Sequence, residues 1–145
     1  MLRALTFVLA LALALAVMAP LAGEAAGDLA IKATELEPLR LGSKDSDYSM
    51  SVKEYRLETG KSYSLEISAF GCKDYDFEAE DFLRNIWIRY IEIGDVTIDA
   101  PVLNEIGFEG EGKVEIFFVP IRTGTYEFKI AGLEEKGMVG KFVVK

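Results

Sequence analysis

Apolar and polar side chains alternate along several short segments, and this pattern constrains the fold more than any other feature of the chain. In residues 61–69, the apolar side chains of Tyr, Leu, Ile and Ala alternate with serine and glutamate. Residues 124–130 repeat the pattern, with Tyr126, Phe128 and Ile130 on one parity. A period of two places successive side chains on opposite faces of a β-strand. Each segment therefore predicts a strand with one face on a core and the other in water.

Other segments resemble strands by composition, because they are rich in β-branched and aromatic residues. They are Leu29–Leu36, Ser49–Leu57, Ile86–Ile93, Lys113–Val119 and Val139–Val144. The adjacent Phe117 and Phe118 must face opposite sides, which predicts a central strand covered on both faces. About seven strands separated by glycine-containing turns predict a single all-β sandwich. Two short helices are predicted in addition, over Glu78–Asn85 and Asp99–Ile106.

The N-terminus has the three parts of a secretory signal peptide. Arg3 precedes an uncharged apolar run from Ala4 to Ala19, and small residues follow Pro20. The run is shorter than the roughly 20 residues of a membrane-spanning helix, although an uncleaved anchor is the alternative. We predict a signal peptide over residues 1–26, cleaved between about 23 and 27, and one domain over 27–145. The mature protein is then periplasmic or secreted and free of the membrane.

The charge and the missing residue types exclude several classes of function. The formal net charge is −8, which argues against nucleic acid and anionic membranes as partners, because both require clustered lysine and arginine. The chain has no histidine, which excludes histidine-based catalytic triads and histidine-ligated zinc. Cys72 is the single cysteine, so no internal disulfide can form. We therefore predict that the protein is not an enzyme.

The C-terminal sequence resembles the closing hairpin of the cupredoxins, plastocyanin in particular. Residues 124–140 read Gly-Thr-Tyr-Glu-Phe-Lys-Ile-Ala-Gly-Leu-Glu-Glu-Lys-Gly-Met-Val-Gly, against the family pattern G-T-Y-x-F-x-C-x-x-H-x-x-x-x-M-x-G. Upstream, Thr59-Gly60-Lys61 and the segment 69–73 resemble the part of the family that carries the first histidine ligand. The resemblance implies a cupredoxin-like Greek-key β-sandwich.

The resemblance also implies that most of the copper ligands are replaced. The family's cysteine falls on Ile130, its second histidine on Leu133, its methionine on Met138 and its first histidine near Lys73. A type 1 copper site needs a thiolate and two imidazoles, with methionine as a weak axial ligand. Three of these four positions are non-ligating here, so the resemblance implies the fold without the family's usual electron transfer.

Cys72 lies next to the position of the first histidine and leaves three interpretations open. Paired with Met138, it forms a soft donor set that suits Cu(I). Alternatively it is a buried small apolar side chain, which is common for free cysteine, with Met138 filling a gap in the core. An intermolecular disulfide is the third interpretation.

Two further features are candidate binding sites. Five carboxylates lie in residues 74–81, and carboxylate oxygens are ligands for hard cations. If the segment is extended, its alternate acids share one face and indicate only a solvated strand edge. Glu134 and Glu135 form a similar pair near Met138. Trp87 with Arg89 is a weak indication of a protein-binding surface.

We therefore expect an exported, non-enzymatic, cupredoxin-like accessory protein that binds a protein partner in the cell envelope. No cofactor is expected in this interpretation. The alternative is a periplasmic copper- or iron-binding protein or metallochaperone that uses Cys72, Met138 and nearby carboxylates.

Overall fold

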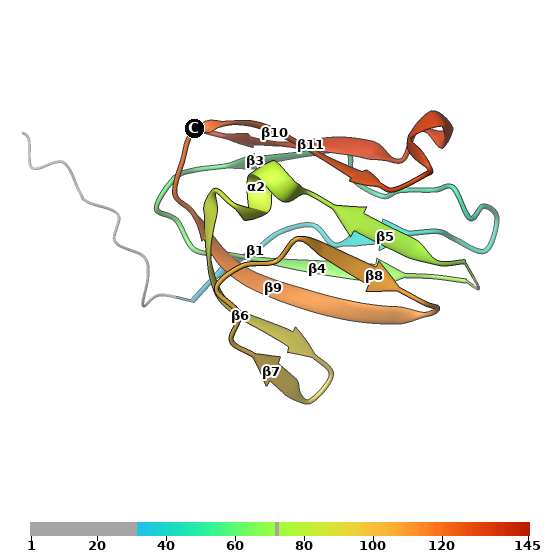
Figure 1. The fold of residues 1–145 in the computed structure, drawn as a ribbon, viewed down its shortest axis with the longest axis horizontal. Coiled ribbons are helices and arrows are strands. Elements are labelled where there is room, and N and C mark those ends of the chain that lie inside the picture. Colours follow the sequence, from blue (N-terminus) through green and yellow to red (C-terminus); the bar gives the residue numbers. More distant parts are fainter. Residues whose placement is uncertain (1–31, 72) are drawn as a thin grey trace, which may run out of the picture.

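Two β-sheets face each other across a shared core in the computed structural model, which describes residues 32–71 and 73–145 (Figure 1). The predicted signal peptide and Cys72 lie outside the described residues. Within the described ranges, no helix has the length and apolar character needed to cross a membrane.

Strand order shows that the chain crosses repeatedly between the two sheets. The first sheet runs β1 (Thr34–Glu35), β4 (Tyr63–Ala69), β9 (Gly112–Pro120), β6 (Ile86–Ile93) and β7 (Val96–Ile98), with β2 (Leu39–Leu41) also paired to β4. The second runs β3 (Glu54–Leu57), β11 (Val139–Val144), β10 (Gly124–Ile130), β5 (Tyr75–Glu78) and β8 (Glu105–Phe108). Parallel pairing of β3 with β11 and of β1 and β2 with β4 joins distant segments. The prediction of an all-β sandwich is confirmed.

The apolar side chains of the strands are buried as predicted, but the polar side of β4 does not face water throughout, because Ser64 is 2% exposed. Along β4 the apolar parity is buried, with Leu65 2% and Ile67 0% exposed. Along β10, Phe128 and Ile130 are fully buried, whereas Tyr126 is half-buried at the edge of the core. The short helix α2 (Glu80–Leu83) adds Phe82 to the same core. Burial of these inward-facing apolar side chains is the main favourable contribution to the free energy of folding, because their apolar area leaves water.

An aromatic cluster fills the centre of the core and places a steric demand on β11. Phe82 stacks on Phe142 with ring centroids 3.8 Å apart, and Phe128 lies 4.9 Å from Phe142. The ring of Phe128 also lies across the backbone of Gly140, its partner in the β10–β11 ladder. A Cβ atom at position 140 would meet this ring and would lie 2.8 Å from the carbonyl oxygen of Lys53. Glycine is therefore needed here for close approach and not for a special backbone angle.

Several local predictions are wrong or incomplete. The predicted helix over 99–106 is absent, and its last residues begin β8. The predicted helix over 78–85 is reduced to α2, because the start of that segment belongs to β5. The described residues form eleven short strands, not seven.

Strand β9 also departs from its prediction. Its inner side chains are buried, but Glu115 and Phe117 are only half-buried on the outer face, where Phe117 stacks on Tyr90 at 4.3 Å. The prediction of a central strand is confirmed, because β9 pairs with both β4 and β6, but its outer face is covered only near its end, where Val119 is 2% exposed. Phe117 finds its contact within its own sheet, while Phe118 is 1% exposed and points into the core.

Candidate binding surfaces

The loop that joins β10 to β11 closes one end of the sandwich with its own backbone hydrogen bonds. The amide of Ile130 donates to the carbonyl of Met138 at 3.0 Å, and the amide of Met138 donates to the carbonyl of Leu133 at 3.3 Å. Between them lies the 3₁₀ turn η2 (Glu134–Lys136), which ends at Gly137 with a left-handed φ of 81°. The Nζ of Lys53 donates to the carbonyl of Gly137 at 2.9 Å. These hydrogen bonds fasten the loop to the end of the sandwich.

The side chains at this closed end are mainly hydrocarbon. Ile130 and Met138 are fully buried, and Leu133 is half-buried against the core. The Met138 thioether is the one soft donor among these three. In the described part of the chain, no three carboxylates lie close enough together to hold a metal ion. This donor set does not fit a type 1 copper ion, which requires a thiolate and two imidazoles.

Lys73 lies near the position that the resemblance assigns to the family's first histidine, and it faces an aromatic ring. Its Nζ lies 5.2 Å from the ring centroid of Tyr48, and the Nζ of Lys136 lies 5.4 Å from the same centroid. Both distances are in the range of cation–π contacts. Lys73 and Lys136 therefore share the ring of Tyr48.

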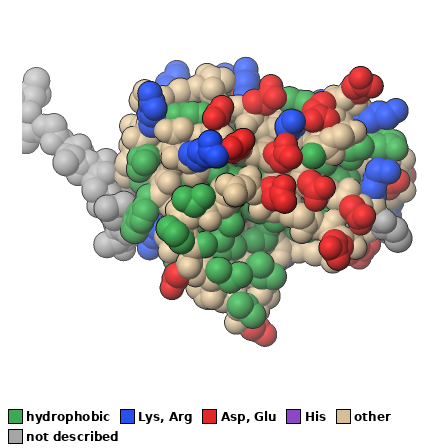
Figure 2. Space-filling model, in the orientation of Figure 1, with side chains coloured by type: hydrophobic (Ala, Val, Ile, Leu, Met, Phe, Trp, Pro, Cys, Tyr) green, Lys and Arg blue, Asp and Glu red, His purple; other side chains and the backbone are tan. Residues whose placement is uncertain are grey.

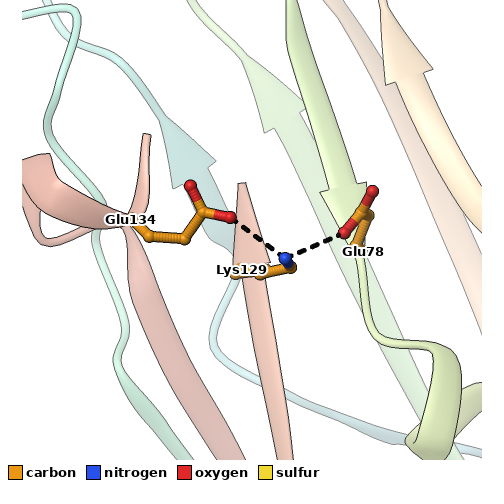
Figure 3. A network of polar contacts seen from close by, with 3 residues as sticks. All are labelled: Glu78, Lys129 and Glu134. Atoms are coloured by element: carbon orange, nitrogen blue, oxygen red, sulfur yellow. Dashed lines mark hydrogen bonds and ion pairs between the residues drawn. The ribbon is translucent and has the colours of Figure 1, made fainter. Parts of the chain in front are cut away.

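A three-residue ionic network joins the closing loop to two strands of the second sheet (Figure 3). The Nζ of Lys129 lies 3.0 Å from Glu134 and 3.3 Å from Glu78. The hydrogen bond to Glu134, followed by the one to Glu78, raises the pKa of Lys129. Glu134 has a lowered pKa, caused first by a backbone hydrogen bond and then by Lys129. Glu134 thus has a structural partner, and the network is open to solvent.

The acidic segment 74–81 alternates as expected for an extended chain. Tyr75, Phe77 and Ala79 are buried, whereas Asp74 and Asp76 point outward. The strand is not an edge, because β5 pairs with β10 on one side and β8 on the other. The interpretation as a solvated edge is wrong on that point, and the acids belong to the outer face of an interior strand.

Trp87 and Arg89 lie near an open groove on the outer face of the first sheet. The groove has a volume of about 480 Å³, and Arg89, Tyr90 and Phe117 are among its lining residues. The guanidinium of Arg89 donates to the hydroxyl of Ser62 at 2.9 Å and lies over the ring of Tyr90. Trp87 is 48% exposed and is not a lining residue.

Sequence reasoning missed one exposed apolar surface, which we call the hairpin surface and define as Ile93, Val96, Ile98 and Val102. Each of these side chains is at least 40% exposed. Figure 2 shows hydrophobic side chains gathered over the part of the molecule where Figure 1 places the β6–β7 hairpin, with acidic side chains around them. Contiguous exposed apolar area of this kind commonly marks an interaction site.

Comparison with known proteins gives similarity at the level of structure alone. No protein-family model matches the sequence, and no curated protein is significantly similar to it. A multicopper oxidase from Campylobacter jejuni superposes at 12% identity over 79% of this chain, with a TM-score of 0.55. A multicopper oxidase from Pediococcus acidilactici superposes at 12% identity over 79% of this chain, with a TM-score of 0.58. The chain spans 30% and 27% of these two oxidases.

Auracyanin from the photosynthetic bacterium Roseiflexus castenholzii superposes with a TM-score of 0.47, at 16% identity over 79% of this chain and 99% of that one. The two-sheet topology and the likeness to the two oxidases give the chain a cupredoxin-like fold. At identities this low, the likeness to solved structures describes the fold and carries no activity with it.

Proposed function

We propose that this protein is an exported, non-enzymatic, cupredoxin-like binding protein that lacks a type 1 copper centre and acts through a protein partner in the cell envelope. The observation that best supports the lack of a copper centre is the closed end of the sandwich, where the β10–β11 loop lies. Ile130 and Leu133 occupy the positions that resemble the family's cysteine and second histidine, and their hydrocarbon is packed against the core. Lys73, near the first histidine position, contacts Tyr48.

Three observations support a binding role. The chain has no histidine for acid–base work near neutral pH. Among the described groups, the pKa shifts belong to exposed ion pairs and to two tyrosines that donate to backbone carbonyls. Shifts of these kinds are typical of structural contacts, because none combines a cleft with a reactive group. The exposed hairpin surface supplies apolar contact area instead.

A copper titration of the processed protein tests the absence of a type 1 centre. The protein is loaded with Cu(I) or Cu(II), desalted and analysed for bound metal and visible absorption. We expect no stoichiometric copper and no intense thiolate–copper band. Retention of one copper per chain, lost in both Cys72→Ser and Met138→Leu, would establish the metal-binding alternative and refute the proposal.

The export part of the proposal has its own test. Expression of the full chain in a bacterium, followed by fractionation and intact-mass measurement, locates the product and its N-terminus. We expect an envelope or secreted product cut between about residues 23 and 27. A full-length cytoplasmic product would refute export.

A further inference from the structure

We propose that the hairpin surface is the docking site for an extended segment of a protein partner, with apolar side chains facing the surface and lysine or arginine at its ends. This inference rests on the proposed function as a protein-binding module. It adds the place on the molecule and the chemistry of the partner.

The hairpin surface is exposed because the first sheet extends beyond the second. In the ladder between β6 and β7, Ile91 pairs with Ile98 and Ile93 pairs with Val96. Paired residues share a face, and Ile91 is buried in the core. The four residues of these two pairs therefore belong to the inner face of the sheet. Exposure rises away from the core, from 4% at Ile91 to 47% at Ile93 and 58% at Val96. An inner sheet face without an opposing sheet is left for a partner to cover.

The hairpin surface continues into a cleft between the two sheets. The cleft has a volume of about 360 Å³ and is lined by Ile93, Ile106 and Val114 as well as by Glu109 and Glu111. Ile106 is half-buried on β8 and packs against the core. The apolar area available to a ligand is therefore larger than the hairpin alone.

The charge around the hairpin surface selects the partner's chemistry. Residues 90–112 contain six carboxylates and no lysine or arginine, so this segment carries −6 of the chain's formal charge of −8. Asp95 and Asp99, both exposed, lie directly before and after β7. The two cations that flank this segment already have partners, because Arg89 donates to Ser62 at 2.9 Å and Lys113 to Glu66 at 2.8 Å. A basic segment is therefore complementary, whereas a second copy would bring carboxylates against carboxylates.

Among residues 32–71 and 73–145, β7 pairs with β6 alone, and this open edge explains why the partner segment is extended. Gly94 and Asp95 form a two-residue turn with φ of 59° at Gly94, as in hairpins with glycine first in the turn. The residues that flank such a turn bond to each other, so Val96 and Ile98 bond inward and Thr97 directs its N–H and C=O to the open edge. An added strand pairs with that edge and lays alternate side chains over the hairpin surface.

Binding of a defined peptide tests the proposal. The probe is a short synthetic peptide of alternating valine and threonine with lysine at both ends, and its counterpart carries glutamate at both ends. Binding to the isotope-labelled protein is followed by NMR at low and high salt. We expect the lysine peptide alone to bind, with shifts in residues 91–112 and an affinity that falls as salt rises. Shifts elsewhere, or equal binding of both peptides, would overturn the proposal.

Variants separate the apolar contribution from the charge contribution. We expect Val96→Ser with Ile98→Ser to weaken binding about tenfold or more, because two apolar contacts are lost. Asp95→Asn with Asp99→Asn removes most of the salt dependence. Ile121→Ser is the matched apolar control, because this side chain is 63% exposed and lies outside the hairpin surface. Equal weakening by the control and the hairpin variants would overturn the assignment.

Thr97→Pro tests the added strand, because proline removes the outward amide but leaves the inward bonds of β7 intact. We expect loss of peptide binding in Thr97→Pro and retention in Thr97→Val, with unchanged folding of both by circular dichroism. Full binding by the proline variant would overturn strand pairing. Self-association that Val96→Ser abolishes would refute a hetero partner, and copper uptake in the titration above would refute the proposed function independently.

Discussion

Replacement of Met138 by alanine and by leucine distinguishes a packing role from a metal-binding role. Met138 is fully buried at the closed end of the sandwich, within the core cluster. Truncation of a buried methionine to alanine removes apolar contacts and leaves a cavity, which costs about 2–5 kcal/mol. Leucine has a similar volume and no thioether, and volume-conserving replacements cost less than about 1.5 kcal/mol.

The two roles predict different patterns for the two variants. If Met138 only packs, Met138→Ala unfolds at much lower urea concentration than wild type, and Met138→Leu stays close to wild type. If Met138 binds Cu(I), both variants lose the donor equally. Copper at about a hundred times its dissociation constant would then stabilise the wild type alone by about 2.7 kcal/mol.

The assay is urea unfolding of the processed protein followed by circular dichroism, with Cu(I) and with a copper chelator. We expect the wild type to have the same midpoint in both conditions and the order wild type, leucine, alanine. Leu133→Ala is the matched control for a half-buried apolar side chain of the same loop. A copper-dependent rise in wild-type stability that is absent from Met138→Leu would refute the packing argument.

Gly140→Ala should lower the free energy of unfolding by about 1–3 kcal/mol in urea titration, because its Cβ meets the Phe128 ring, and Phe128→Leu should relieve part of this loss. Burial raises the pKa of Tyr55, so its contribution to stability is complete below about pH 10 and falls as the pH rises above that value. Urea midpoints between pH 8 and 11 should therefore decline less steeply in Tyr55→Phe than in the wild type. An unchanged slope would contradict this assignment. Lys129→Met should change the unfolding midpoint little, because its two ion pairs are exposed, and a loss above about 1 kcal/mol would show that the network is needed to hold the loop.

The inner parity of the strands was predictable from the sequence, because local alternation determines which side chains share a face. Leu65 and Ile67 on β4 and Phe128 on β10 are buried as their alternation predicts. The failed helix over 99–106 shows the limit of local signals. Asp99 and Pro101 are compatible with a helix start, but Ile106 pairs with Phe77 across the sheet, and that tertiary pairing prevails.

The closed end was predictable in part. The resemblance to the cupredoxin hairpin implied that Ile130, Leu133 and Met138 lie together at one end of the sandwich, and backbone hydrogen bonds join Met138 to the other two. The contact of Lys73 and Lys136 with Tyr48 was not predictable, because it joins loops that are distant in sequence. No local pattern specifies such a pairing.

The hairpin surface could not be predicted for a more general reason, which also bears on function. Ile91 and Ile93 have the same residue type and the same parity on one strand, yet Ile91 is 4% and Ile93 47% exposed. Burial at these positions depends on where the opposing sheet ends, and sequence periodicity does not contain that boundary. A sandwich with one sheet wider than the other must leave apolar inner-face residues in water or cover them with another chain. Asp95 and Asp99 beside the hairpin surface, with Glu109 and Glu111 in the adjoining cleft, favour hydration of this exposed face and disfavour its pairing with a copy of itself. The same charges that make the surface tolerable in the free protein thus define which partner can cover it.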